Sequence, residues 1–161
     1  MIELLRVDDR LIHGQVAVSW TAHLGADVIV VANDRAATDK LMQSAFRLAQ
    51  PPQTTLSIKS VQGAILVINN PKHASRKIFV VCASPEDALR IVRECPSVRS
   101  VCLGGIRQSG DRRRVSPQVF LNDDDMAAIE GMVELGAQVT LQPVPDQSPM
   151  SLAAIRRAYG A

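Results

Sequence analysis

The sequence predicts an α/β fold, an open, mostly parallel, twisted sheet of about six or seven strands with helices on both faces. Short β-branched runs alternate along the chain with longer stretches of helical periodicity, as in repeated strand–helix units. Several of the short runs are continuously apolar, which is typical of strands buried on both faces. Aromatic residues make up only 3% of the 161 residues, so the core of this sheet has to be aliphatic.

Strands and helices are expected in alternation from one end of the chain to the other. The expected strands are Ile2–Val7, Val28–Ala32, Thr55–Ile58, Ile78–Ala83, Val98–Leu103 and Gln138–Gln142. The expected helices are Gly14–Leu24, Thr38–Gln50, Val61–Asn70, Pro85–Glu94, Asp123–Leu135 and Pro149–Tyr159.

The residues at the ends of the helices support these bounds. Gly25 and Gly136 each follow a helical stretch, where a residue in the left-handed conformation commonly ends the helix. Ser84 and Pro85 suit the N-cap and the first helical position of the fourth helix. Asn122 is followed by three aspartates, which favour the positive end of the fifth helix. Prolines end the second and fourth helices.

Length and composition indicate one soluble, intracellular domain that spans residues 1–161. The formal net charge is +2. No apolar run approaches the ~18 residues that a membrane-spanning helix needs, and the N-terminus lacks the pattern of a signal peptide. Cys82, Cys95 and Cys102 are odd in number and widely spaced, which argues against a disulfide framework. We expect them to be small buried hydrophobic residues at strand ends.

The common motifs for nucleotide, serine-hydrolase and metal chemistry are missing. The sequence contains no Gly-x-Gly-x-x-Gly, no Gly-x-Ser-x-Gly and no His-Glu-x-x-His. The glycines of residues 105–110 have the spacing of a phosphate-binding loop, but Asp111 and Arg112 replace its Lys and Ser/Thr. The cysteines lack the close spacing of a zinc site, so we expect neither a metal nor a bound cofactor.

Basic residues gather in two regions of the chain. No acid occurs between Asp39 and Glu86, and Arg112–Arg114 forms a second basic cluster. Nucleic-acid binding would call for interleaved aromatic residues and a larger positive charge, so no nucleic-acid partner is expected. Solvated faces, together with docking to an acidic protein, explain this charge pattern better.

The segment Asp8–Val16 follows the first strand and begins the first helix. His13 therefore lies at a strand-to-helix turn, where a ligand or partner can reach it. The amides of Gly14 and Gln15 are helix-start donors that stabilise an anion, and Arg10 adds a charged fork suited to phosphate oxygens.

Asp8 or Asp9 could hold one imidazole nitrogen of His13 as N–H, which leaves the other nitrogen free to attack phosphorus. Together with Arg10 and the helix-start amides, these groups describe a histidine that accepts and passes on a phosphoryl group. A structural reading, with a surface ion pair and a helix-capping histidine, fits the same residues. Local chemistry alone leaves both readings open.

The stretch Arg6–Val16 resembles the active-site signature of the IIB components in the mannose/fructose/sorbose family of the bacterial phosphoenolpyruvate-dependent sugar phosphotransferase system. Shorter similarities follow in the order found in that family, and the length matches a free-standing IIB domain. These similarities are at Val31–Asp39, Ser84–Leu89, Gly104–Ile106 and Gln142–Pro145.

The resemblance implies that His13 is the phosphorylated histidine and that Arg10 is the arginine beside it. The protein would take a phosphoryl group from a IIA protein and deliver it to a sugar bound by the membrane components IIC and IID. It would work in the cytoplasm at the inner face of the membrane. The family includes monomers and dimers, so a homodimer is left open.

Some features lie outside this pattern or bear on alternatives. Cys102 stands where the family commonly has a polar residue, and Arg112–Arg114 is unusually basic. Asn33, Asp34, Ser84 and Gly104–Gly110 are expected near the His13 loop, but turn chemistry alone is the favoured explanation of Asn33, Asp34 and Ser84. The alternative functions are a sensor that binds a phosphorylated metabolite at the same loop, and a nucleic-acid-binding module that uses the arginine clusters.

Overall fold

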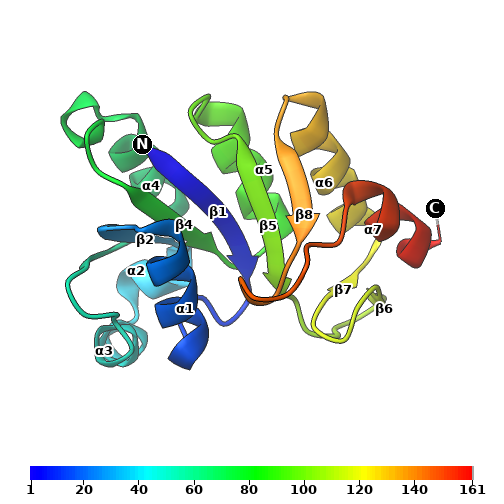
Figure 1. Cartoon of the computed structure of the whole chain (residues 1–161), viewed down its shortest axis with the longest axis horizontal. Helices are drawn as coiled ribbons and strands as arrows, with labels where there is room; N and C mark the ends of the chain where they lie inside the picture. The colour runs from blue at the N-terminus through cyan, green and yellow to red at the C-terminus, as the bar shows by residue number, and fades with distance from the viewer. Residues whose placement is uncertain (161) are drawn as a thin grey trace.

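The computed structural model describes residues 1–160, and its main feature is a six-stranded sheet in the order β3-β2-β4-β1-β5-β8 (Figure 1). All neighbouring strands in this sheet pair in parallel. The predicted fold class is therefore confirmed. The strands are β1 (Ile2–Asp8), β2 (Val28–Ala32), β3 (Thr55–Lys59), β4 (Ile78–Cys82), β5 (Ser100–Gly105) and β8 (Gln138–Leu141).

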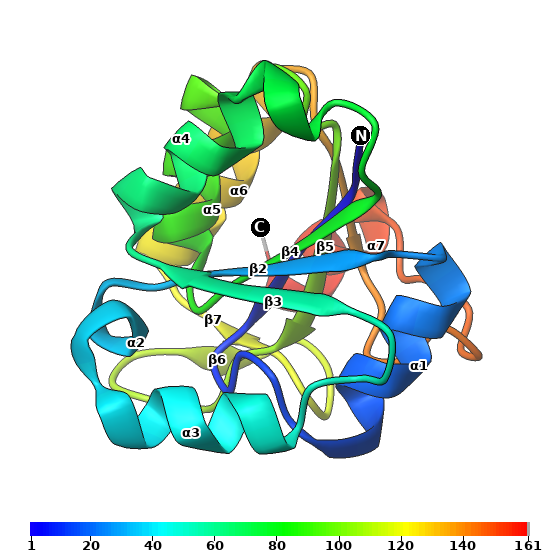
Figure 2. The ribbon, with the colours of Figure 1, turned by 90° about the vertical axis from the view of Figure 1, so that its left-hand side faces the viewer.

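Helices cover both faces of the sheet, as Figure 2 shows from the β3 edge. One face carries α1 (Gly14–Leu24), α2 (Asp34–Thr38) and α3 (Lys40–Leu48). The other carries α4 (Val61–Asn69), α5 (Pro85–Glu94) and α6 (Asp123–Glu134), and α7 (Leu152–Tyr159) packs beside β8. No helix of the described chain has the length and apolar character to pass through a bilayer.

Two local expectations were wrong. No helix was expected before Thr38, but Asp34–Thr38 forms α2. The helix expected over Thr38–Gln50 is present as the separate α3, because Asp39 leaves the helical conformation between the two. Its side chain accepts a hydrogen bond from the amide of Met42 and so begins a new helix. The last helix begins later than expected, because Met150 forms a bridge to Leu141 and Ser151 is the N-cap.

The structure also contains short elements that the hydrophobic pattern did not predict. The loop after β5 folds into a small antiparallel pair, β6 (Arg113–Arg114) with β7 (Phe120–Leu121). A 3-10 helix, η1 (Pro71–His73), precedes β4. Elements this short contain too few residues to show a periodicity.

The central strand β1 places its carboxyl end between two diverging connections. β1 continues through α1 to β2 on one side of the sheet, whereas its neighbour β5 continues to β8 on the other side. Ligands of open α/β sheets bind where neighbouring connections diverge in this way, because the loops leave a crevice between them. The loop after β1 is the segment that contains His13.

Candidate phosphorylation site

The loop between β1 and α1 is anchored in the core by two of its own side chains. Leu11 and Ile12 are buried in the apolar cluster under α1. Leu11 has a φ of 61° and Gly14 has a φ of 46°, both in the left-handed region. This conformation is unfavourable for a residue with a side chain, so the backbone of the loop is held in shape by burial rather than by local preference.

His13 is the N-cap residue of α1, but its side chain does not cap the helix. Its Nε2 instead lies 2.9 Å from Oδ2 of Asp8, and 24% of its side chain is exposed. The other ring nitrogen, Nδ1, is therefore the one left to react with a ligand. Because the imidazole does not occupy the helix end, the first amides of α1, at Gly14 and Gln15, are left as donors beside it.

The carboxylate that holds His13 is fully buried. Asp8 accepts hydrogen bonds from His13, from the amide of Arg10 at 3.0 Å and from the guanidinium of Arg6 at 3.3 Å. Burial alone would raise the pKa of Asp8, but the hydrogen bonds from His13 and the Arg10 amide, with the charge of Arg6, hold this pKa below its ordinary value. Asp8 is therefore an ionised acceptor next to the imidazole.

Arg6 is a site residue that was not singled out from the sequence. Its guanidinium is buried and donates to the carbonyls of Gln142 and Pro143 as well as to Asp8. It also lies over the ring of Trp20, with Cζ 5.3 Å from the ring centroid. The signal in the sequence was an arginine between the apolar residues Leu5 and Val7 of a buried strand, a position where a charge has to have buried partners.

Of the two carboxylates expected to orient the imidazole, only Asp8 contacts it. Asp9 accepts hydrogen bonds from the backbone amide and the side chain of Arg107, at 2.8 Å and 3.2 Å. Arg6 and Asp8 are two residues apart in β1 and so share the face covered by α1, whereas Asp9, the first residue after the strand, turns toward the loop after β5. The expectation that Asp9 orients His13 is corrected accordingly.

Arg10 lies at the rim of the loop with 47% of its side chain exposed. Its Nε is 3.5 Å from Oδ1 of Asp8, and the rest of the guanidinium extends along a hollow of about 250 Å³ beside Asp9 and Gly105. Its guanidinium keeps exposed N–H donors that suit an anion. The structure thus gathers Asp8, Arg10, His13 and the start of α1 at one point.

The other candidate residues have structural roles. Asn33 and Ser84 cap α2 and α5, and Asp34 accepts from the amide of Val61, which fits turn chemistry. All three cysteines are buried, as predicted, and burial raises the pKa of Cys95 to about 11 and those of Cys82 and Cys102 above their ordinary value. None of them is a reactive thiolate at neutral pH.

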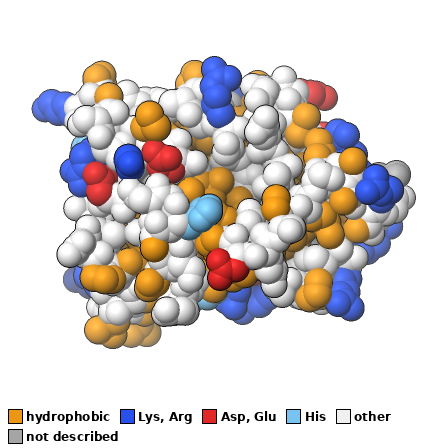
Figure 3. Space-filling view, viewed as in Figure 1, with side chains coloured by type: hydrophobic (Ala, Val, Ile, Leu, Met, Phe, Trp, Pro, Cys, Tyr) orange, Lys and Arg blue, Asp and Glu red, His pale blue; other side chains and the backbone are white. Residues whose placement is uncertain are grey.

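Two of the three arginines in the cluster Arg112–Arg114 contact side chains of the same chain. Arg112 pairs with Asp125 at 2.9 Å, and Arg113 lies over the ring of Tyr159. On the face drawn in Figure 3, basic side chains are scattered around the rim and separated by other surface. This face therefore lacks the continuous basic stripe that is typical of a nucleic-acid-binding surface.

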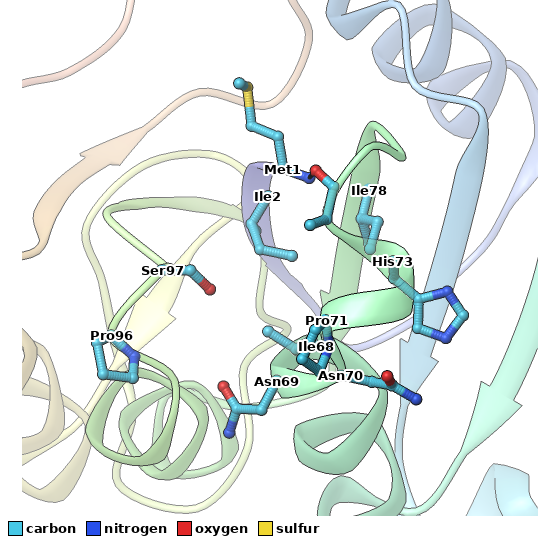
Figure 4. Close-up of a pocket in the computed structure, with 11 residues that line it drawn as sticks. Met1, Ile2, Ile68, Asn69, Asn70, Pro71, His73, Ile78, Pro96 and Ser97 are labelled. Carbon is cyan, nitrogen blue, oxygen red and sulfur yellow. Dashed lines mark hydrogen bonds between the residues drawn. The ribbon is translucent and has the colours of Figure 1, made fainter.

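A cavity of about 380 Å³ lies at the opposite edge of the sheet, where β1 and β4 begin (Figure 4). Its lining is mostly aliphatic, with polar side chains from Asn69, Asn70, His73 and Ser97. Asn69 donates to the carbonyl of Glu94, and Asn70 caps η1, so both have structural partners. The cavity contains none of the candidate site residues, which lie instead at the carboxyl ends of the strands.

The comparison with protein families decides the family of the chain. The sequence model of the PTS system sorbose subfamily IIB component matches residues 2–158. The chain belongs to this family of phosphotransferase-system IIB components. It is therefore a phosphocarrier component of a sugar phosphotransferase system, as the resemblance at Arg6–Val16 predicted.

Individual relatives agree with this assignment. The sorbose-specific EIIB component of Lacticaseibacillus casei is 33% identical over 161 residues, which covers 99% of this chain and 98% of the relative. The mannose-specific EIIAB component of Escherichia coli K12 is 31% identical over 144 residues, 89% of this chain but 45% of the relative. The crystal structure of the IIBSor domain of the sorbose permease from Klebsiella pneumoniae has a TM-score of 0.93 and 28% identity, and covers 100% of this chain and 99% of that one.

Proposed function

We propose that His13 accepts a phosphoryl group on Nδ1 from a IIA protein and passes it to a sugar of the sorbose/mannose class. The sugar is bound by the membrane components IIC and IID, so the IIB domain, acting as one unit, works at the inner face of the membrane. The contact of 2.9 Å between Nε2 of His13 and Asp8 carries the proposal, because it fixes which nitrogen attacks.

In the first step, the lone pair of Nδ1 attacks phosphorus in line with the P–N bond of the phosphohistidine on the donor. That bond breaks as the new N–P bond forms, and the imidazole of the donor leaves. His13 keeps its proton on Nε2, where the negative charge of Asp8 stabilises the cationic phosphoimidazole. No proton has to move within this chain during transfer.

The anion that arrives on His13 has donors around it. Arg10 contributes a guanidinium, and the amides of Gly14 and Gln15 point out of the positive end of α1. These groups neutralise the phosphoryl oxygens in the transition state. In the second step the oxygen of a sugar hydroxyl forms the new O–P bond as the N–P bond breaks, and Nδ1 leaves with its lone pair. The hydroxyl proton passes to water or to a base of the membrane component, and the same donors stabilise the charge on the phosphoryl oxygens.

The relatives support the choice of partners. The name of the E. coli relative joins an A and a B component in one chain, and this chain matches 45% of that relative. The relative from L. casei is specific for sorbose. We therefore assign a IIA protein as the donor and a ketose or hexose of this class as the final acceptor. All the groups required at His13 come from one chain, so the transfer itself needs no second copy.

Intact mass under alkaline conditions tests this function. The protein is incubated with phosphoenolpyruvate, Enzyme I, HPr and a IIA protein of the family, and we expect one added phosphoryl group that acid removes. His13→Gln should abolish the addition, whereas the control His23→Gln, at an exposed position in α1, should keep it. Phosphorylation of the His13→Gln variant, or a phosphorus–nitrogen coupling to Nε2, would contradict the proposal.

A further inference from the structure

We propose that Arg6 is a positioning residue of the phosphorylation site, which fixes the Asp8 carboxylate and, through it, the ring of His13. The inference rests on the proposed role of His13. One guanidinium nitrogen of Arg6 donates to Asp8 at 3.3 Å and to the carbonyl of Pro143 at 2.9 Å. The other donates to the carbonyl of Gln142 at 3.0 Å.

The chemistry of this position requires a guanidinium. Arg6 is 3% exposed and Asp8 is fully buried, so neither charge is solvated by bulk water. A planar fork with several N–H donors can reach a carboxylate and two carbonyls at once, which a lysine ammonium on a flexible chain does less well. An ionised Asp8 with a fixed direction is therefore a consequence of the Arg6 contacts.

The neighbouring strand leaves space for this guanidinium. A Cβ atom on Gly104 would lie 2.0 Å from Cζ of Arg6, so any side chain at this position would displace the guanidinium. The indole of Trp20, from α1, donates to the same carbonyl of Pro143 that Arg6 uses. Segments from β1, β5, α1 and the loop after β8 thus meet at Arg6, and the distant C-terminal part of the chain helps to orient His13.

The close fit between Arg6 and Gly104 allows a matched set of variants. Arg6→Met removes the guanidinium but keeps the length of the stem, and Gly104→Ala places a methyl group where the guanidinium lies. In the double variant the methyl group occupies the vacated space, so its melting temperature should exceed that of Arg6→Met. The phosphorylation rate should fall about 10- to 100-fold in Arg6→Met and should stay low in the double variant. If the double variant regains melting temperature but keeps a low phosphorylation rate, the loss of rate is not caused by poor packing. Arg6 then acts on the position of His13.

Two further measurements use properties that packing alone would not move. In the unphosphorylated wild type, nitrogen NMR should show the proton of His13 on Nε2, and the double variant should show a mixture of tautomers. The acid limb of the rate–pH profile should move to higher pH in the double variant, because Arg6 is one of the groups, with His13 and Arg10, that stabilise ionised Asp8. A double variant with the wild-type rate, tautomer and profile would overturn the inference.

The NMR comparison also separates this inference from the proposed function, because it needs no phosphoryl donor. Failure of the wild type to become phosphorylated would count against the role of His13 as the acceptor. An unchanged tautomer in the double variant would count against Arg6 even if phosphorylation of the wild type proceeds normally.

Discussion

The imidazole Nε2 of His13 lies 2.9 Å from Oδ2 of Asp8, the last residue of the central strand. A partly exposed residue of a loop is thereby tied to a fully buried group of the sheet. The direction in which His13 presents its free nitrogen is set by the sheet, which is more rigid than a surface loop. Several measurable consequences depend on this pair.

Replacement of Asp8 by Asn should slow phosphorylation of His13 by at least about 100-fold, because an amide no longer stabilises the cationic ring or selects its tautomer. Asp9→Asn is the matched control, since its amide oxygen can still accept from Arg107 and its side chain does not contact His13. Stopped-flow or quench measurements with a phosphorylated IIA donor give both rates. Equal losses in the two variants would show that the loop as a whole, and not Asp8, governs the reaction.

Acid should destabilise the protein partly through Asp8. Its pKa in the folded state lies below the ordinary value, so its contribution to stability is complete above that value and is lost as the pH falls through the folded pKa. The free energy of unfolding should therefore fall less between pH 6 and pH 3 in Asp8→Asn than in the wild type. Urea unfolding at several pH values measures this difference, and parallel curves for the two proteins would contradict it.

The sequence was sufficient to predict the architecture because each long element carries its own signal. All six strands of the main sheet and the helices from α4 to α6 were expected within a few residues of their observed bounds. The short helix α2 was not expected, since its five residues are too few to show a helical periodicity and side-chain caps at Asn33 and Asp39 separate it from its neighbours. The strands β6 and β7 were also missed, because they form only by pairing with each other and no local pattern indicates them.

The features of the site divide in the same way, into those with a local signal in the sequence and those that depend on long-range contacts. The His13 loop could be found from the sequence because its chemistry lies within consecutive residues. The choice between Asp8 and Asp9 depends on which face of the sheet each side chain takes, and the role of Arg6 depends on carbonyls more than 130 residues away in the chain. A single sequence does not show such long-range partners. It shows only that a charged residue stands at a position where a buried strand usually has an apolar one.

The left-handed backbone at Gly14 should be required for function. An alanine there meets no neighbouring atom, so the only cost is conformational, about 1–2 kcal/mol. Gly110→Ala is the matched control, because Gly110 is also in the left-handed region with open space around it. Urea unfolding should show similar losses for both variants, whereas only Gly14→Ala should slow phosphorylation. Wild-type kinetics in Gly14→Ala would show that the start of α1 takes no part in transfer.

The arginine cluster should prove structural. Arg112 lies mostly out of solvent against the buried carboxylate of Asp125, so Arg112→Met should lower the free energy of unfolding by about 1–3 kcal/mol. Arg114 is exposed, and Arg114→Met should have little effect. Neither the wild type nor these variants should bind an oligonucleotide in a salt-sensitive manner. Tight, salt-sensitive binding that both substitutions weaken would restore the nucleic-acid hypothesis.

The free protein should bind sugar phosphates only weakly, with a Kd above about 1 mM. A Kd of 1 mM corresponds to a standard free energy of binding of roughly −4 kcal/mol. A bidentate hydrogen bond from Arg10 contributes about 1.5–3 kcal/mol, and ordering of an exposed side chain and of the ligand opposes it. A carrier needs no tighter binding of a free sugar phosphate, because its donor protein brings the phosphoryl group directly to His13. Calorimetric titration with a sugar phosphate measures the affinity, with Arg10→Gln as the control. A micromolar Kd that this substitution abolishes would instead identify a sensor, since a site that stores a metabolite has to retain it without a partner.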